Sequence, residues 1–268
     1  MDYNFFDYKE TFTEVHDKFG IAHIITICLA FVLIIVACFL MRKLSRKQVG
    51  IFLKVWSIIA FVAELGYQIW DAYWSFRYGN GDYLLNGLPT FTCTMYLYCV
   101  IIAAWTKGKV QRVSLAFLTT TSLMCGISGL IQLNGLNFYP FWTFGAFNSI
   151  FFHFSMTFIG AILLATKYVV IEWKDIIRAY IPLLLLAVIA IPVDYVLHAD
   201  YMQVYSAIGV PVLSDLATIL SAHNLRWLFT IIFMILYIPF GAIPVAIIKL
   251  VYYIITKTTH KEIAPLGE

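Results

Sequence analysis

Apolar residues fall into seven long stretches, and each stretch is long enough to cross a membrane as a helix. A helix needs about 20 apolar residues to cross a hydrocarbon core of about 30 Å. The stretches lie near residues 20–41, 49–74, 88–106, 113–132, 145–171, 176–197 and 225–255. The pattern predicts an all-α, polytopic membrane protein. We expect a bundle of about seven transmembrane helices that forms one integral-membrane domain over residues 1–268.

Composition excludes a soluble enzyme. The 268 residues are 62% apolar and only 12% charged, whereas soluble domains usually carry about 25% charged residues. The net charge is +3 and no long run of like charges occurs, so we expect no nucleic-acid partner. The 5 cysteines form no C-x-x-C pair, and we expect no disulfide, metal ion or cofactor.

Basic residues alternate between the two sides of the predicted membrane. Thirteen Lys and Arg lie in the connections near 42–48, 106–112 and 167–178 and at the C-terminal end, whereas four lie on the other side. Positively charged loops stay in the cytoplasm, so the N-terminus is predicted outside and the C-terminus inside. The first nineteen residues are acidic rather than basic, and we expect them to be retained rather than cleaved as a signal peptide.

Strongly polar residues gather in the outer half of the predicted bundle. On the second span, Glu64, Gln68 and Asp71 lie on one helical face. On the fifth span, His153 lies about 12 Å below the outer end, from the rise per residue. Glu64 and His153 are too deep to reach water easily, so each needs a partner or a wet cavity. We expect both to line an outward-opening cavity with Gln68.

Other polar residues near this end have a functional and a structural interpretation. His23 begins the first span and Asp194 ends the sixth, and His23 and Asp71 are close enough to the interface to be simply solvated. The candidates for lining the cavity are Glu64, Gln68, Asp71, Gln132, Asp194 and His23. The small residues on the same face as Gln132 are typical of helix packing, and we assign them no chemistry.

Cys93 is the candidate nucleophile. It follows Leu88 and Pro89 at the start of the third span, at about the depth of His153. A helix N-terminus and an imidazolium both lower the pKa of a thiol. Cys93 and His153 are therefore the predicted catalytic pair, although the sequence does not place them in contact.

The order of several short motifs resembles the YwaF-type integral membrane family. These motifs are Gly20-Ile21-Ala22-His23, the stretch from Glu64 to Gln68, Leu88-Pro89-Thr90-Phe91-Thr92-Cys93, Ser128-Gly129-Leu130-Ile131-Gln132, Phe151-Phe152-His153, and Asp194 with Asp200-Tyr201-Met202. The resemblance implies about seven helices and a location in the bacterial cell membrane. For the phospholipid acyltransferases of that family it implies an acyl-cysteine intermediate, which maps onto Cys93 with His153 as the matching histidine. That family often has a histidine two residues before the cysteine, where this sequence has Phe91.

Two functions remain open at this point. In the first, the protein moves a fatty acyl group between lipids through Cys93, and its partner is a membrane phospholipid. A site that opens outwards favours a phospholipid ester over cytosolic acyl-CoA as the donor. In the second, the polar residues form a proton-coupled or ligand-holding cavity of a small-solute transporter or binding protein. A retinal protein is disfavoured, because the only lysines within spans, Lys54 and Lys249, lie near cytoplasmic ends.

Overall fold

The protein is all-helical over the part of the chain that the structure describes. We analysed a computed structural model, which describes residues 3–12, 15, 17–79, 83–207 and 211–259. The α-helices are α1 (Ile21–Met41), α2 (Arg46–Tyr78), α3 (Met95–Trp105), α4 (Gly108–Thr119), α5 (Thr121–Ile131), α6 (Phe144–Ala165), α7 (Asp175–Leu197), α8 (Pro211–Ala222) and α9 (Arg226–Thr259). Short helical turns cover Lys9–Thr11, Tyr83–Gly87 and Asn134–Asn137. These elements confirm the predicted all-α fold of a polytopic membrane protein.

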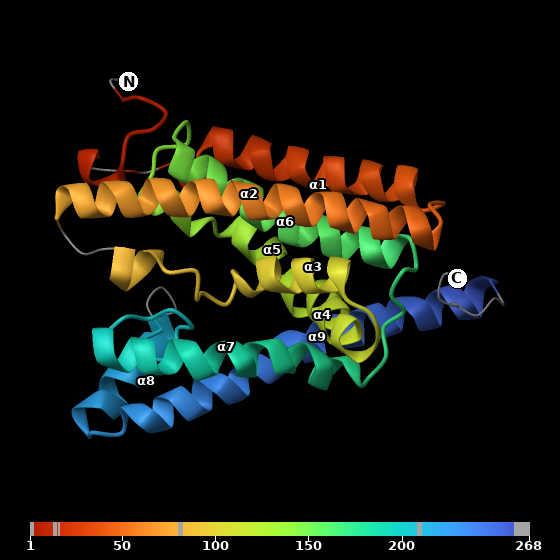
Figure 1. The fold of residues 1–268 in the computed structure, drawn as a ribbon. Helices are drawn as coiled ribbons and strands as arrows, with labels where there is room; N and C mark the ends of the chain where they lie inside the picture. The colour runs from red at the N-terminus through yellow and green to blue at the C-terminus, as the bar shows by residue number, and fades with distance from the viewer. Residues whose placement is uncertain (1–2, 13–14, 16, 80–82, 208–210, 260–268) are drawn as a thin grey trace.

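The helices form two outer groups with a central group between them (Figure 1). One outer group contains α1, α2 and α6, and the other contains α7, α8 and α9. The central helices join them, because α3 packs against α2, α4 and α7, α4 against α6 and α7, and α5 against α6 and α9. The main apolar core lies around α3, where Tyr96, Cys99, Val100 and Ala103 are almost completely buried.

In the part of the chain that the structure describes, six helical segments are long and apolar enough to cross a membrane. They are α1, α2, the stretch Gly108–Asn137 that contains α4 and α5, α6, α7 and α9. The third predicted span, near 88–106, contains only the 11-residue helix α3. At 1.5 Å per residue this helix is about 16 Å long, roughly half of the hydrocarbon thickness. The chain before it, from Leu88 to Thr94, is not helical.

The fourth predicted span, near 113–132, is interrupted at Thr120. The backbone there has φ −126° and ψ −88°, which ends α4 and allows α5 to start in a new direction. Thr120 donates its hydroxyl hydrogen to the carbonyl oxygen of Ala116 at 2.6 Å, and Thr119 donates to that of Leu115 at 2.7 Å. Both threonines are fully buried. The break is tolerated in a membrane because surrounding protein shields it from lipid.

Local sequence signals set the ends of α2. Ser45 and Gln48 form a reciprocal cap at its start, in which the side chain of each accepts a hydrogen bond from the backbone N–H of the other. The helix ends at Gly79, whose φ of +67° is a left-handed conformation that favours glycine. Pro182 and Pro192 lie inside α7, Pro239 and Pro244 lie inside α9, and both helices continue through them.

Candidate functional site

Cys93 lies on the non-helical segment before α3, inside the helical bundle. Backbone groups in this setting have no water to bond with, so side chains must replace it. The Tyr201 hydroxyl accepts a hydrogen bond from the Leu88 N–H at 3.3 Å and donates one to the Leu84 carbonyl at 2.7 Å. The Tyr98 hydroxyl donates to the Pro89 carbonyl at 2.8 Å. The irregular backbone is therefore stabilised by two tyrosines, one from α3 itself and one from the loop after α7.

The thiol of Cys93 is near the N-terminal end of α3. Cys93 directly precedes Thr94, the N-cap residue of α3, whose own N–H donates to the Phe91 carbonyl at 3.0 Å. It is also within electrostatic range of the Glu64 carboxyl and of the Cys125 thiol on α5. Hydrogen-bond donors at a helix N-terminus stabilise a thiolate. The structure therefore places Cys93 just before the start of α3, and its activation as a nucleophile stays a prediction.

His153 has a defined tautomer. Its Nδ1 lies 2.8 Å from the Ser149 carbonyl oxygen one turn earlier in α6. A carbonyl can only accept, so Nδ1 carries the hydrogen, and Nε2 of the neutral ring has a free lone pair. Among the described residues, none hydrogen-bonds to Nε2. The ring packs against Gly129 of α5 so closely that a Cβ at Gly129 would lie 1.9 Å from the ring carbon Cδ2.

The two candidate catalytic residues approach the same helix at neighbouring turns. Cys93 is within electrostatic range of Cys125 on α5, and His153 packs on Gly129, which is four residues further along α5. Residues four apart lie on the same helical face, about one turn from each other. No hydrogen bond joins Cys93 to His153 within the described part of the chain. The tertiary structure thus places both along one face of α5 without a direct bond.

The polar face of α2 forms a hydrogen-bonded line. Gln68 donates from Nε2 to the Glu64 Oε1 at 2.7 Å, and its Oε1 accepts from the Tyr83 hydroxyl at 2.8 Å. Glu64 is only 8% exposed. Further along this face, the buried Asp71 accepts from the hydroxyl of Tyr8 at 2.8 Å. Tyr8, in the N-terminal segment, therefore covers Asp71. This buried position differs from the solvated one that the structural interpretation of the sequence allowed.

His23 links two parts of the fold. Its Nδ1 accepts from the Phe19 N–H at 3.0 Å, so Nε2 carries the hydrogen and donates to the Leu130 carbonyl at 3.0 Å. Leu130 lies in the last turn of α5, where carbonyl groups lack helical partners. Both ring nitrogens are thus used, and the ring is buried. This arrangement supports a structural role that joins the start of α1 to the end of α5.

The remaining sequence candidates lie away from Cys93. Gln132 follows the last residue of α5, and its side chain is exposed. Asp194 is completely buried near the end of α7, where Oδ1 accepts from the Tyr201 N–H at 2.8 Å. Asp194 therefore fixes the loop that carries Tyr201. Its other oxygen has no hydrogen-bond partner among the described residues.

Sequence reasoning missed two residues beside Cys93. Thr92 Oγ1 lies 2.6 Å from the hydroxyl of Tyr237 on α9, and that hydroxyl donates to the Met202 carbonyl at 2.6 Å. A tyrosine in an apolar span usually signals packing or the membrane interface. In the sequence, the one signal that pointed to these residues was that Thr92 directly precedes the candidate nucleophile Cys93. Phe91 stands where the YwaF-type family often has a histidine. Its ring packs edge-on against Tyr201 with ring centroids 4.9 Å apart.

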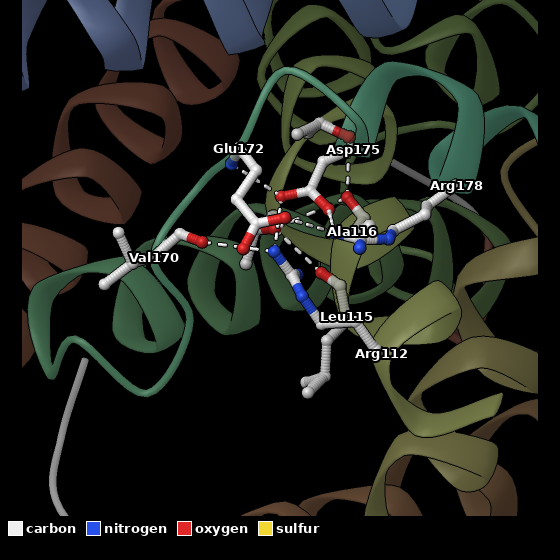
Figure 2. Close-up of polar contacts among 9 residues, drawn as sticks. Arg112, Leu115, Ala116, Val170, Glu172, Asp175 and Arg178 are labelled. Carbon is white, nitrogen blue, oxygen red and sulfur yellow. Dashed lines mark hydrogen bonds and ion pairs between the residues drawn. The ribbon is translucent and has the colours of Figure 1, made fainter. Parts of the chain in front are cut away.

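An ion-pair cluster stabilises the opposite end of the bundle (Figure 2). Asp175, at the start of α7, has no exposed side-chain surface and accepts from Arg112 at 2.5 Å and from Arg178 at 2.8 Å. Arg178 also bonds to Glu172 at 2.8 Å. This hydrogen bond lowers the pKa of the Glu172 carboxyl, and nearby positive charge adds to the effect. The cluster ties α4 to α7 and holds no candidate catalytic residue.

Within the described residues, no three His, Cys, Asp or Glu side chains gather where they could hold a metal ion. Comparison with curated proteins gives no match, and comparison with solved structures gives none either. Comparison with protein-family models overturns the YwaF-type assignment, because the model that matches is that of the TMEM164 family, over residues 18–244. The YwaF-type interpretation was wrong because it relied on short motifs, and the bacterial cell membrane that it implied stays a prediction. Since the match covers most of the chain and the helices suit a membrane, this integral membrane protein belongs to the TMEM164 family.

Proposed function

We propose that this protein transfers a fatty acyl group between membrane lipids through a thioester on Cys93. The observation that carries the proposal is the position of Cys93, in the non-helical segment directly before the half-length helix α3 and packed against the apolar core. A helix N-terminus is one of the settings that favour a thiolate over a thiol. The surrounding apolar core suits a lipid substrate.

The proposed reaction has two steps. First, the Cys93 thiol gives its proton to Nε2 of His153 and attacks the ester carbonyl of a phospholipid. A carbon–sulfur bond forms, the ester carbon–oxygen bond breaks, and the lysolipid oxygen takes the proton from His153. Second, an acceptor lipid hydroxyl gives its proton to His153 and attacks the thioester. The ester forms, the carbon–sulfur bond breaks, and the thiol regains its proton.

The tautomer of His153 supports its role in this scheme. The Ser149 carbonyl holds the hydrogen on Nδ1, which leaves the Nε2 lone pair available as a general base. The absence of a direct Cys93–His153 bond is compatible with catalysis, because catalytic hydrogen bonds often form fully only when substrate is bound. The packing of the ring against Gly129 fixes its orientation.

The test uses purified protein and a phospholipid with a fluorescent acyl chain. Wild-type protein should acquire label that hydroxylamine removes, because hydroxylamine cleaves thioesters much faster than oxygen esters. Cys93→Ser should lose this label, whereas the matched controls Cys99→Ser and Cys125→Ser should retain it. His153→Ala should slow labelling about 10²- to 10⁴-fold, and His223→Ala, at an exposed histidine, should not. Label that persists in Cys93→Ser, or none in wild type, would refute the proposal.

The hydrogen-bonded line of Glu64, Gln68 and Tyr83 favours a second candidate, a binding or transport site for a small polar solute. A buried carboxyl with one hydrogen-bonded neighbour is typical of ligand or proton sites in membrane proteins. Glu64→Gln distinguishes the two functions. It should abolish uptake or binding of a polar solute if transport is the function, and Cys93→Ser should then have no effect.

A further inference from the structure

Two buried tyrosines from the second half of the chain hold the segment that carries Cys93. Tyr201, in the loop after α7, bonds to both Leu84 and Leu88. Tyr237, in α9, bonds to Thr92 and is only 7% exposed. The segment also makes short turns of its own, in which the Thr90 N–H donates to the Leu88 carbonyl and the Thr94 N–H to the Phe91 carbonyl. The tyrosine hydroxyls join these turns to distant parts of the fold. The partner of Tyr237, Thr92, is the residue directly before Cys93.

The hydrogen bonds of Tyr237 have a fixed direction. Its hydroxyl has one hydrogen, and the Met202 carbonyl at 2.6 Å can only accept, so that hydrogen is committed to Met202. The Thr92 hydroxyl, 2.6 Å away, must therefore be the donor to Tyr237. The result is a chain of two hydrogen bonds, from Thr92 to Tyr237 and from Tyr237 to Met202. These bonds join the Cys93 segment, α9 and the loop after α7.

The loop that anchors this line is itself held firmly. Asp200 accepts hydrogen bonds from the backbone N–H groups of Tyr205 and Ser206, both at 3.0 Å. The buried carboxyl of Asp194 accepts from the N–H of Tyr201. Met202 lies between these anchored residues and is completely buried. The Met202 carbonyl, which accepts the hydrogen bond from Tyr237, is therefore held in a fixed position.

We propose that Tyr237 is a positioning residue, whose hydroxyl fixes Thr92 and thereby holds the Cys93 sulfur against the N-terminal end of α3. The inference rests on the proposed function of Cys93 and adds a named residue to it. Loss of the hydroxyl leaves the Thr92 hydroxyl and the Met202 carbonyl unpaired in a buried setting, and the segment shifts to satisfy them. Cys93, the next residue, then shifts relative to the start of α3.

The experiment measures two properties of Tyr237→Phe, which removes only the hydroxyl. Hydroxylamine-sensitive labelling should slow about 10- to 100-fold, because small misplacements of reacting groups have effects of this size. The maximal rate should fall, with the lipid concentration for half-maximal rate unchanged. Alkylation of Cys93 by iodoacetamide, followed by mass spectrometry of its peptide, should slow about two- to fivefold as helix N-terminal stabilisation is lost.

The controls separate positioning from a general loss of stability. Tyr180→Phe removes a similar bond, from a tyrosine hydroxyl to the Met234 carbonyl of α9 at 2.8 Å, away from Cys93. It should leave both rates unchanged. Thr92→Val should match Tyr237→Phe, and the double variant should be no slower than either single one. If Tyr237→Phe alkylates at the wild-type rate, or Tyr180→Phe has the same effect, the proposal is wrong.

The alkylation assay needs no acyl donor, so it distinguishes the two proposals. If wild-type protein takes up no acyl label but Tyr237→Phe still slows alkylation of Cys93, acyl transfer is refuted and positioning by Tyr237 stands. If acyl labelling depends on Cys93 but is insensitive to Tyr237→Phe, acyl transfer stands and positioning is refuted.

Discussion

Replacement of Gly129 by alanine tests the contact between α5 and His153. A Cβ at this position would lie 1.9 Å from the His153 Cδ2 and 2.5 Å from Nε2. Carbon atoms in contact prefer separations of about 3.5–4.0 Å, so the ring must move by about 1.5 Å or more. Such a movement breaks or distorts the 2.8 Å bond from Nδ1 to the Ser149 carbonyl.

Two opposing free energies determine the stability of Gly129→Ala. Alanine is more favourable than glycine in a helix by about 1 kcal/mol. Overpacking a close contact costs about 1–3 kcal/mol. We therefore expect a free energy of unfolding that is unchanged or about 2 kcal/mol lower, never higher. Acyl labelling should fall about 10²-fold, because the general base is displaced by more than 1 Å.

Gly66→Ala is the matched control. Gly66 is inside α2, and a Cβ there would meet nothing within 4 Å. It should gain the helical preference of alanine without any clash, so its unfolding temperature in detergent should stay level or rise, and labelling should be unchanged. If Gly129→Ala is stabilised as much as Gly66→Ala and is labelled at the wild-type rate, the His153 ring does not pack on Gly129 as described.

The remaining predictions concern the opposite end of the bundle and the orientation in the membrane. Asp175→Ala should lower the free energy of unfolding by about 3–5 kcal/mol, because it leaves a partly buried arginine without its partner. Glu172→Gln, at a side chain that is 56% exposed, should change the free energy of unfolding by less than about 1 kcal/mol. Equal unfolding temperatures for the two variants would contradict this reasoning. A reporter fused after Glu268 should be cytoplasmic, and a cysteine at the exposed Asn137 should be labelled from outside. The reverse labelling pattern would overturn the orientation and the argument for an external acyl donor.

Hydrophobic pattern alone determined most of the architecture. Helices that cross a membrane must bury their own backbone polar groups and present apolar side chains to lipid, so long apolar stretches identify them. Five of the seven predicted spans contain one long continuous helix for this reason, and a sixth contains α4 and α5 in one apolar stretch. The polar face of α2 was also predictable, because residues four apart meet on a helix, as Gln68 and Glu64 do.

Tertiary contacts decided the rest. The segment before α3 is as apolar as a helix, but in the structure it is irregular, and Tyr201 bonds to the Leu88 N–H, Tyr98 to the Pro89 carbonyl and Tyr237 to the Thr92 hydroxyl. Tyr201 and Tyr237 are 113 and 145 residues away from these partners, so no local pattern encodes them. The sequence likewise allowed Asp71 to be solvated at the interface, and only the structure shows that the hydroxyl of Tyr8 bonds to it. Burial and pairing of polar groups depend on which distant segments pack together, and only the folded structure determines that.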